Sequence, residues 1–153
     1  MSAIRPKVRA STLDGAASDL FSQQAQSADS DPAMVILVVE DDVIVRMLAC
    51  DILTDAGHHT LEAVDAAEAL RLLDARPDIA LVFTDVDMPG EINGLGLGRL
   101  ISLKTPDLPM IITTGGANVS PGDLPASARF LQKPYTPDAL RTLIEQMIVA
   151  PPA

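Results

Sequence analysis

The chain has 153 residues, enough for one domain with a hydrophobic core of its own. Its formal net charge of -10 at pH 7 argues against a nucleic-acid partner, because phosphate contacts need a basic surface. The single cysteine cannot form an internal disulfide, no apolar run is long enough to span a membrane, and no apolar signal core follows the first basic residues. We therefore expect a cytoplasmic protein without a membrane partner.

Residues 1–33 are rich in Ser, Ala, Gln and Asp and contain few large apolar side chains. Such a segment cannot bury enough surface to offset the conformational entropy lost on ordering. We predict a disordered N-terminal extension at 1–33 and one folded domain at 34–150. A transient helix is the alternative for the extension, because Leu13, Leu20 and Phe21 could form a short apolar stripe.

From Met34 onward, two kinds of apolar pattern alternate along the chain. Near-continuous runs at 34–39 and 79–84 are typical of strands buried on both faces of a parallel sheet. Weaker strand patterns lie at 59–63, 109–114 and 128–132. Apolar residues at helical spacing predict helices at 45–56, 66–76, around 97–101 and at 137–148.

Five strands that alternate with helices predict an α/β fold with a doubly wound, five-stranded parallel sheet. The connection between the fourth and fifth strands differs from the others, because it contains Pro121, Gly122 and Pro125 and has little apolar periodicity. A proline in a helix interior costs about 3 kcal/mol. We therefore expect the fourth helix to be short or absent.

Polar side chains end four of the predicted strands: Glu40 with Asp41, Asp85, Thr114 and Lys133. Right-handed crossovers bring these strand ends to one edge of the sheet, where open α/β sheets bind their ligands. Carboxylates that converge there would repel one another without a cation, and an all-oxygen donor set suits Mg²⁺. A hydroxyl and an ammonium suit a phosphoryl group, and an Asp carboxylate can itself be the nucleophile. The residues predict a Mg²⁺-assisted aspartyl phosphorylation site.

In their order and spacing, these residues resemble the receiver domain of two-component response regulators. The resemblance covers about residues 34–149 and implies the flavodoxin-like receiver fold. The matching motifs are Val38-Val39-Glu40-Asp41-Asp42, Thr84-Asp85 with Met88-Pro89, the strand-ending Thr114, and Lys133-Pro134.

The resemblance implies a role for each site residue. Asp85 would accept the phosphoryl group from a histidine kinase or a phosphotransfer protein. Mg²⁺ would be held by Asp41, by Glu40 through water, by Asp85 and by the backbone carbonyl of Asp87. Thr114 would be the switch hydroxyl, Lys133 the phosphoryl-binding ammonium before a cis Pro134, and Phe130 the switch aromatic residue.

Together, these roles predict a stand-alone response regulator. Its phosphorylation would change a surface that binds an unknown downstream protein. It would be a phospho-acceptor and not an enzyme, apart from self-phosphorylation and self-dephosphorylation. One alternative is a Mg²⁺-dependent phosphohydrolase with an aspartyl nucleophile, for which Asp87 supplies a second acid but the chain has no room for a cap domain. Another is a degenerate receiver that binds partners without phosphorylation, against which the intact set of site residues argues.

Several of these residues also have simpler interpretations. The acids after the first strand could merely cap the following helix, and Asp42 is the best candidate for that role. Phe130 could be an ordinary core residue. His58 and His59 follow Gly57 in a predicted turn without an expected function, and Cys50 is expected to be a small packing residue.

Overall fold

The chain consists of two compact units, Met1–Pro32 and Ala33–Ala153. The computed structural model describes residues 33–116 and 119–149, which belong to the second unit. The extension predicted at 1–33 therefore lies outside the described residues, apart from Ala33. None of the helices in the described ranges has the length and apolar character needed to cross a bilayer.

The second unit is built on one five-stranded sheet in which every neighbouring pair of strands is parallel. The strands, in the spatial order β2-β1-β3-β4-β5, are β1 (Val35–Val39), β2 (His59–Ala63), β3 (Ile79–Asp85), β4 (Met110–Thr114) and β5 (Ala128–Gln132). The helices are α3 (Val43–Asp55), α4 (Ala66–Ala75), α5 (Gly94–Lys104) and α6 (Pro137–Val149). The predicted doubly wound parallel sheet is confirmed.

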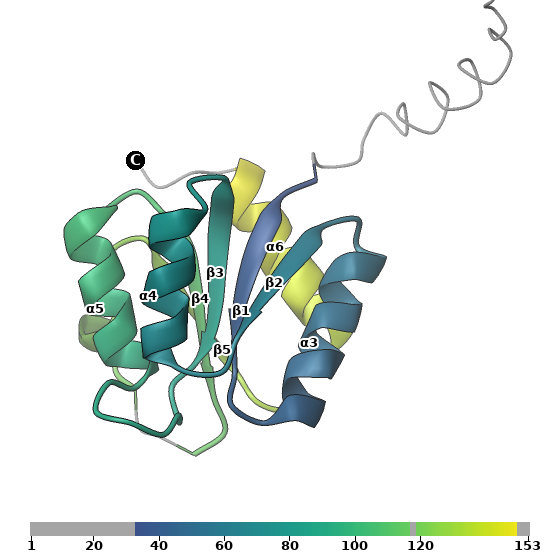
Figure 1. The fold of residues 1–153 in the computed structure, drawn as a ribbon. Coiled ribbons are helices and arrows are strands. Elements are labelled where there is room, and N and C mark those ends of the chain that lie inside the picture. Colours follow the sequence, from purple (N-terminus) through teal and green to yellow (C-terminus); the bar gives the residue numbers. More distant parts are fainter. Residues whose placement is uncertain (1–32, 117–118, 150–153) are drawn as a thin grey trace, which may run out of the picture. The chain divides into compact units, whose positions relative to one another are not determined.

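Helices cover both faces of the sheet: α4 and α5 lie on one side, and α3 and α6 lie on the other (Figure 1). Side chains of β1 therefore contribute alternately to two cores, with Leu37 and Val39 facing one and Ile36 and Val38 facing the other. All four are at most 1% exposed. This two-sided burial explains why the central strands are continuous apolar runs in the sequence.

Short polar residues cap the helices that follow the first three strands. Asp42 caps α3 by accepting hydrogen bonds from the amides of Ile44 and Val45, at 2.9 and 3.0 Å. Asp65 and Asn93 cap α4 and α5 in the same way. Because the strands are parallel, the connections that follow β1, β2 and β3 all begin at the same edge of the sheet.

The connection between β4 and β5 has no α-helix among the residues that the structure describes there. It contains a short 3-10 turn, η2 (Pro121–Asp123), which confirms the expectation from its prolines. Val119 and Leu124 of this connection pack against the core on the α4–α5 side of the sheet. The loop therefore covers part of the surface that a helix would otherwise cover.

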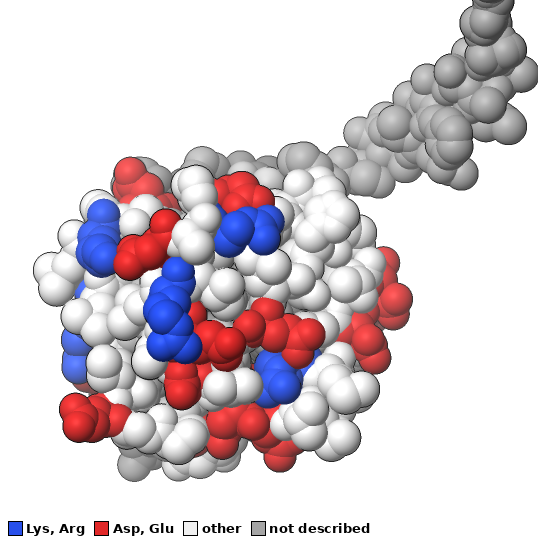
Figure 2. Space-filling model, in the orientation of Figure 1, with Lys and Arg blue, Asp and Glu red and all other residues white. Residues whose placement is uncertain are grey.

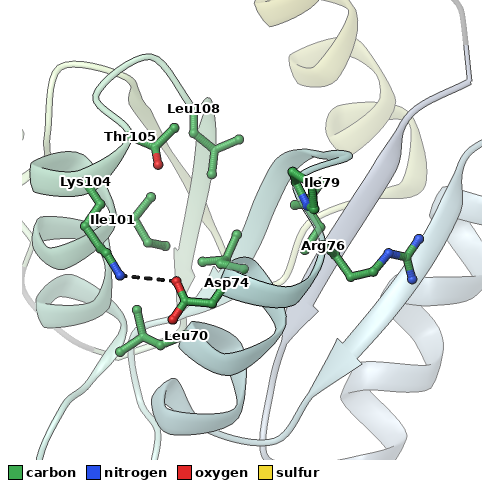
Figure 3. A pocket seen from close by; sticks show the side chains of 10 residues that line it. Leu70, Asp74, Arg76, Ile79, Ile101, Lys104, Thr105 and Leu108 are labelled. Carbon is green, nitrogen blue, oxygen red and sulfur yellow. Dashed lines mark hydrogen bonds and ion pairs between the residues drawn. The ribbon is translucent and has the colours of Figure 1, made fainter.

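A cavity of about 260 Å³ lies at the opposite edge of the sheet, between the carboxyl ends of α4 and α5. Apolar side chains such as Leu70, Ile101 and Leu108 line it, and an ion pair of 3.2 Å joins Asp74 to Lys104 across it (Figure 3). Both charged side chains are mainly exposed, so this pair contributes little to stability. The cavity is separate from the strand ends that carry the predicted site.

Candidate functional site

Three carboxylates converge at the carboxyl edge of the central strands. Glu40 and Asp41 follow β1, and Asp85 ends the neighbouring strand β3. One oxygen from each residue lies within 4.8 Å of the others. Glu40 and Asp85 are each 5% exposed, whereas Asp41 is open to solvent. The structure thus brings together the acids that the sequence assigns to a cation site.

Lys133, directly after β5, supplies a positive charge to this cluster. Its Nζ lies 3.2 Å from Glu40 Oε1 and 3.4 Å from Asp85 Oδ1. Its backbone amide donates to the carbonyl of Thr114 at 3.0 Å, and the Lys133–Pro134 peptide is cis. The ammonium therefore lies beside two of the three acids.

Burial dominates the electrostatics of the cluster. It raises the pKa of the Asp85 carboxyl even though the Lys133 ammonium opposes the shift, and it raises the pKa of Glu40 in the same way. Burial alone would lower the pKa of Lys133, but the charges of Asp85 and Glu40 outweigh it and raise that pKa. Three acids and one ammonium leave an excess of negative charge, and two of the acids, Glu40 and Asp85, are buried.

The donor set fits a hard divalent cation such as Mg²⁺. All three groups offer oxygen, which Mg²⁺ prefers, and ligands of an octahedral Mg²⁺ are about 3–4 Å apart. Asp85 Oδ1 is buried and accepts no hydrogen bond from the described residues, since the Lys133 ammonium makes only an ion-pair contact with it. The acidic cluster is therefore compatible with a magnesium site.

Thr114 ends β4, the strand that pairs with β3. Its hydroxyl donates to Asp87 Oδ2 at 2.8 Å and accepts a hydrogen bond of 3.3 Å from the amide of Gly116. The resemblance to receiver domains implies only a backbone role for Asp87, so this contact of its side chain is an addition to that expectation. The neighbouring Thr113 hydroxyl is buried without a hydrogen-bond partner among the described residues.

Phe130 lies in β5, the strand at the edge of the sheet, opposite Ile112 of β4. It is half-buried, and neither core cluster of the described residues includes it. This position does not support the interpretation of Phe130 as an ordinary core residue.

Two further side chains at the site were not singled out from the sequence. Arg46 of α3 donates to the carbonyl oxygen of Glu40 at 2.8 Å. Tyr135, just after the cis peptide, packs its ring edge against Phe83 at 5.8 Å between centroids. Burial, together with the charges of Glu40 and Asp85, raises the pKa of Tyr135 to about 12. No local pattern distinguishes either residue from an ordinary helix or loop residue.

Gly94 explains how the loop after β3 is held close to Asp85. A Cβ atom at this position would lie 2.1 Å from the carbonyl oxygen of Asp85, so any side chain would collide with the backbone of the site. The amide of Gly94 also donates to the carbonyl of Val86 at 3.0 Å. The close approach therefore requires glycine.

Charged side chains are unevenly distributed on the surface. On the face seen in Figure 2, Asp and Glu side chains form a band across the centre, and the Lys and Arg side chains are scattered around it. The described part of this face has no continuous basic surface of the kind that nucleic-acid phosphates need.

A doubly wound parallel sheet with carboxylates, a hydroxyl and an ammonium at its carboxyl edge defines the class of flavodoxin-like receiver folds. Comparison with known proteins agrees, because the family model of the response regulator receiver domain matches residues 36–145. The chain belongs to the family of response regulator receiver domains.

Named relatives and a solved structure show the same likeness. The chain is 35% identical to the response regulator receiver protein CpdR of Brucella abortus over 75% of its own length and 97% of that protein. It is 33% identical to the chemotaxis protein CheY1 of Helicobacter pylori, again over 75% of its length and 97% of the relative. The crystal structure of the receiver domain of NtrX from Brucella abortus superposes with a TM-score of 0.69 and 34% identity, over 75% of this chain and 98% of that one.

Proposed function

We propose that this receiver domain accepts a phosphoryl group on Asp85 from a histidine kinase or a phosphotransfer protein. The observation that carries the proposal is the environment of Asp85 Oδ1, which is buried, makes no hydrogen bond with the described residues and lies between two acids and an ammonium. A carboxylate oxygen that is not already satisfied is the natural nucleophile of the cluster.

In the transfer, an Asp85 carboxylate oxygen forms a bond to phosphorus while the bond from phosphorus to the donor's histidine nitrogen breaks. The departing imidazole keeps the electron pair and is restored to its neutral form by taking a proton. Lys133 offers its ammonium to the phosphoryl oxygens, and the Thr114 hydroxyl exchanges its bond with Asp87 for one with the phosphoryl group. This exchange is the step that passes phosphorylation on to the surrounding surface and its downstream protein.

Glu40, Asp41, Asp85 and the backbone carbonyl of Asp87 are the groups that would hold Mg²⁺. When bound, the ion supplies positive charge that neutralises the phosphoryl oxygens. Glu40 is oriented for this role by two contacts, the Lys133 ammonium on Oε1 and the Asp42 amide on Oε2 at 3.1 Å.

The phosphodonor protein would dock on α3, beside the site. Val43, Ile44, Met47 and Leu48 are all more than half exposed there. A groove of about 730 Å³ runs from Leu48 to Gly115 and Lys133, so this surface is continuous with the surroundings of the site. Ile44→Lys should slow transfer from a phosphorylated histidine kinase without changing uptake from acetyl phosphate, whereas Leu103→Lys, on the exposed part of α5, should change neither.

The direct test of the proposal is phosphorylation itself. The full chain is incubated with Mg²⁺ and acetyl phosphate, and the modified residue is located by mass spectrometry after stabilising the acyl phosphate. Asp85→Asn should take up no label, and Asp78→Asn, at the opposite edge of the sheet, should take up as much as wild type. Undiminished label in folded Asp85→Asn would contradict the assignment. Turnover of a phosphomonoester substrate would instead support a phosphohydrolase.

A further inference from the structure

Arg46 joins two strand ends through one guanidinium group. Its Nη1 donates to the carbonyl oxygen of Glu40 and its Nε donates to Glu62 Oε1, each at 2.8 Å. The Arg46 side chain is only 12% exposed, although it begins on the first turn of α3 near the surface. A guanidinium fixed at two points has little freedom to move.

The carbonyl of Glu40 belongs to the peptide that links Glu40 to Asp41. The other contacts of Glu40 hold different atoms: its amide donates to the carbonyl of Ala63, and its carboxylate contacts Lys133 and the Asp42 amide. Because a peptide is planar, fixing this carbonyl also fixes the direction in which the backbone enters Asp41. Asp41 is the exposed acid of the cluster.

We propose that Arg46 is a positioning residue for cation binding: it holds the Glu40–Asp41 peptide so that both carboxylates face Asp85. Glu62 keeps the guanidinium in place, since its carboxylate accepts from Nε. The inference rests on the proposed function, because it concerns the affinity of the site for Mg²⁺.

The charge of Arg46 and its hydrogen bonds have opposite effects on the affinity of the site for Mg²⁺. A positive charge near the site repels a cation, so removing it would tighten Mg²⁺ binding if charge were the only contribution. Losing the hydrogen bond to Glu40 would instead let the ligands move apart and weaken binding. Groups that orient metal ligands typically contribute about 10–100-fold to metal affinity. A rise in Mg²⁺ affinity on removing Arg46 would therefore indicate that its charge dominates, and a fall would indicate that its hydrogen bonds dominate.

The experiment measures Mg²⁺ affinity by isothermal titration calorimetry on the full chain, and the melting temperature in EDTA on the same samples. Arg46→Met keeps the apolar stem and should weaken Mg²⁺ binding about 10-fold or more. Arg46→Lys keeps the charge but loses the two-point attachment, so it should also weaken binding. Glu62→Gln should weaken it by a smaller factor. The matched control is Arg76→Met, whose guanidinium pairs with the exposed Asp78 at the far edge of the sheet.

The inference would be overturned if both Arg46 variants bound Mg²⁺ as tightly as wild type or more tightly. It would also be overturned if the variants melted at a lower temperature than wild type in EDTA but bound Mg²⁺ with unchanged affinity. If Arg46→Met fails to fold, Arg46→Lys and Glu62→Gln decide the question by the same criterion. Absence of Mg²⁺ binding by the wild-type chain would refute the proposed cation site, and this inference with it. If instead the wild-type chain binds Mg²⁺ and the Arg46 variants bind it equally well, only the inference about Arg46 is refuted and the proposed cation site stands.

Discussion

Asp85→Asn should make the protein more stable when no divalent cation is present, although it removes the proposed phosphorylation site. The ionised Asp85 carboxylate is 5% exposed and lies within 4.8 Å of two other acids. Burial raises its pKa, so the native state holds the proton to higher pH than the unfolded chain does. The free energy of unfolding should therefore fall as pH rises above 3.8, the ordinary pKa of an Asp carboxyl, and the charged form of Asp85 destabilises the native state at pH 7.

The size of the effect follows from the distances. With an effective dielectric constant of about 20, and with both other acids placed at the 4.8 Å limit, each repulsion amounts to about 3.5 kcal/mol, and the attraction to Lys133 at 3.4 Å amounts to about 5 kcal/mol. Removing the Asp85 charge relieves two repulsions and loses one attraction, a net gain of about 2 kcal/mol. Solvent screening of the exposed Asp41 reduces this gain to nearer 1 kcal/mol, roughly 4 °C in melting temperature for a unit of this size.

The assay is thermal unfolding followed by circular dichroism at pH 7, in EDTA and in excess Mg²⁺. Asp85→Asn should melt above wild type in EDTA, and only wild type should gain appreciably from Mg²⁺, because a ligand stabilises only the state that binds it. Asp78→Asn is the control, since its exposed carboxylate is paired with Arg76 and its pKa is lowered by that pair. An Asp85→Asn protein that melts at or below wild type in EDTA would refute the account of charge crowding.

Three other changes test neighbouring parts of the argument. Gly94→Ala should destabilise the protein by more than about 2 kcal/mol and impair phosphorylation, because the new Cβ would lie 2.1 Å from the carbonyl oxygen of Asp85. The control is Gly122→Ala, since Gly122 has open space around it, and equal melting temperatures of the two variants would contradict the predicted clash at Gly94. Asp41→Ala should lose most of the Mg²⁺-dependent rise in melting temperature, and a rise as large as that of wild type would remove Asp41 from the ligand set. A chain that begins at Met34 should take up phosphate and unfold like the full chain, and a loss of several degrees would show that the extension contributes to the fold.

The order of the elements was predictable because a strand that is buried on both faces of a sheet appears in the sequence as a continuous apolar run. The runs at 34–39 and 79–84 contain β1 and β3. The helix predicted at 45–56 ends at Asp55, shortly before Gly57, whose backbone φ of +96° suits glycine. The short 3-10 turn at Pro121–Asp123, in the place expected for a fourth helix, was predictable for the same local reason, because a proline disrupts the helical turn that contains it. Each of these signals depends only on nearby residues.

The convergence of Glu40, Asp41, Asp85 and Lys133 was also predictable, because parallel topology alone brings their strand ends to one edge. The contacts of Arg46 were not predictable in this way. A helical arginine four residues after Asp42 fits an exposed position as well as a buried one. Its attachment to Glu40 and Glu62 depends on how α3 packs against β1 and β2, which no local pattern records.

The hydrogen bond from Thr114 to Asp87 leads to a last prediction. A hydroxyl has a single proton to donate, and the structure gives that of Thr114 to Asp87 Oδ2 at 2.8 Å. A phosphoryl group on Asp85 must compete with Asp87 for this proton, so the Asp87 carboxylate stabilises the unphosphorylated arrangement. A hydrogen bond to a charged acceptor contributes about 1.5–3 kcal/mol, and the low end applies to the exposed Asp87.

Asp87→Ala should therefore tighten the binding of trifluoroberyllate, a phosphoryl analogue, by about tenfold, since 1.4 kcal/mol corresponds to a factor of ten. Asp87→Asn removes the charge but keeps an acceptor, so it should tighten binding much less if the hydrogen bond is the cause. Equal effects of the two variants would assign the change to charge repulsion instead. In a Thr114→Val background the competition no longer exists, and Asp87→Ala should then have little effect. A tenfold change that persists in that background would show that Asp87 acts on the phosphoryl site by a route other than Thr114.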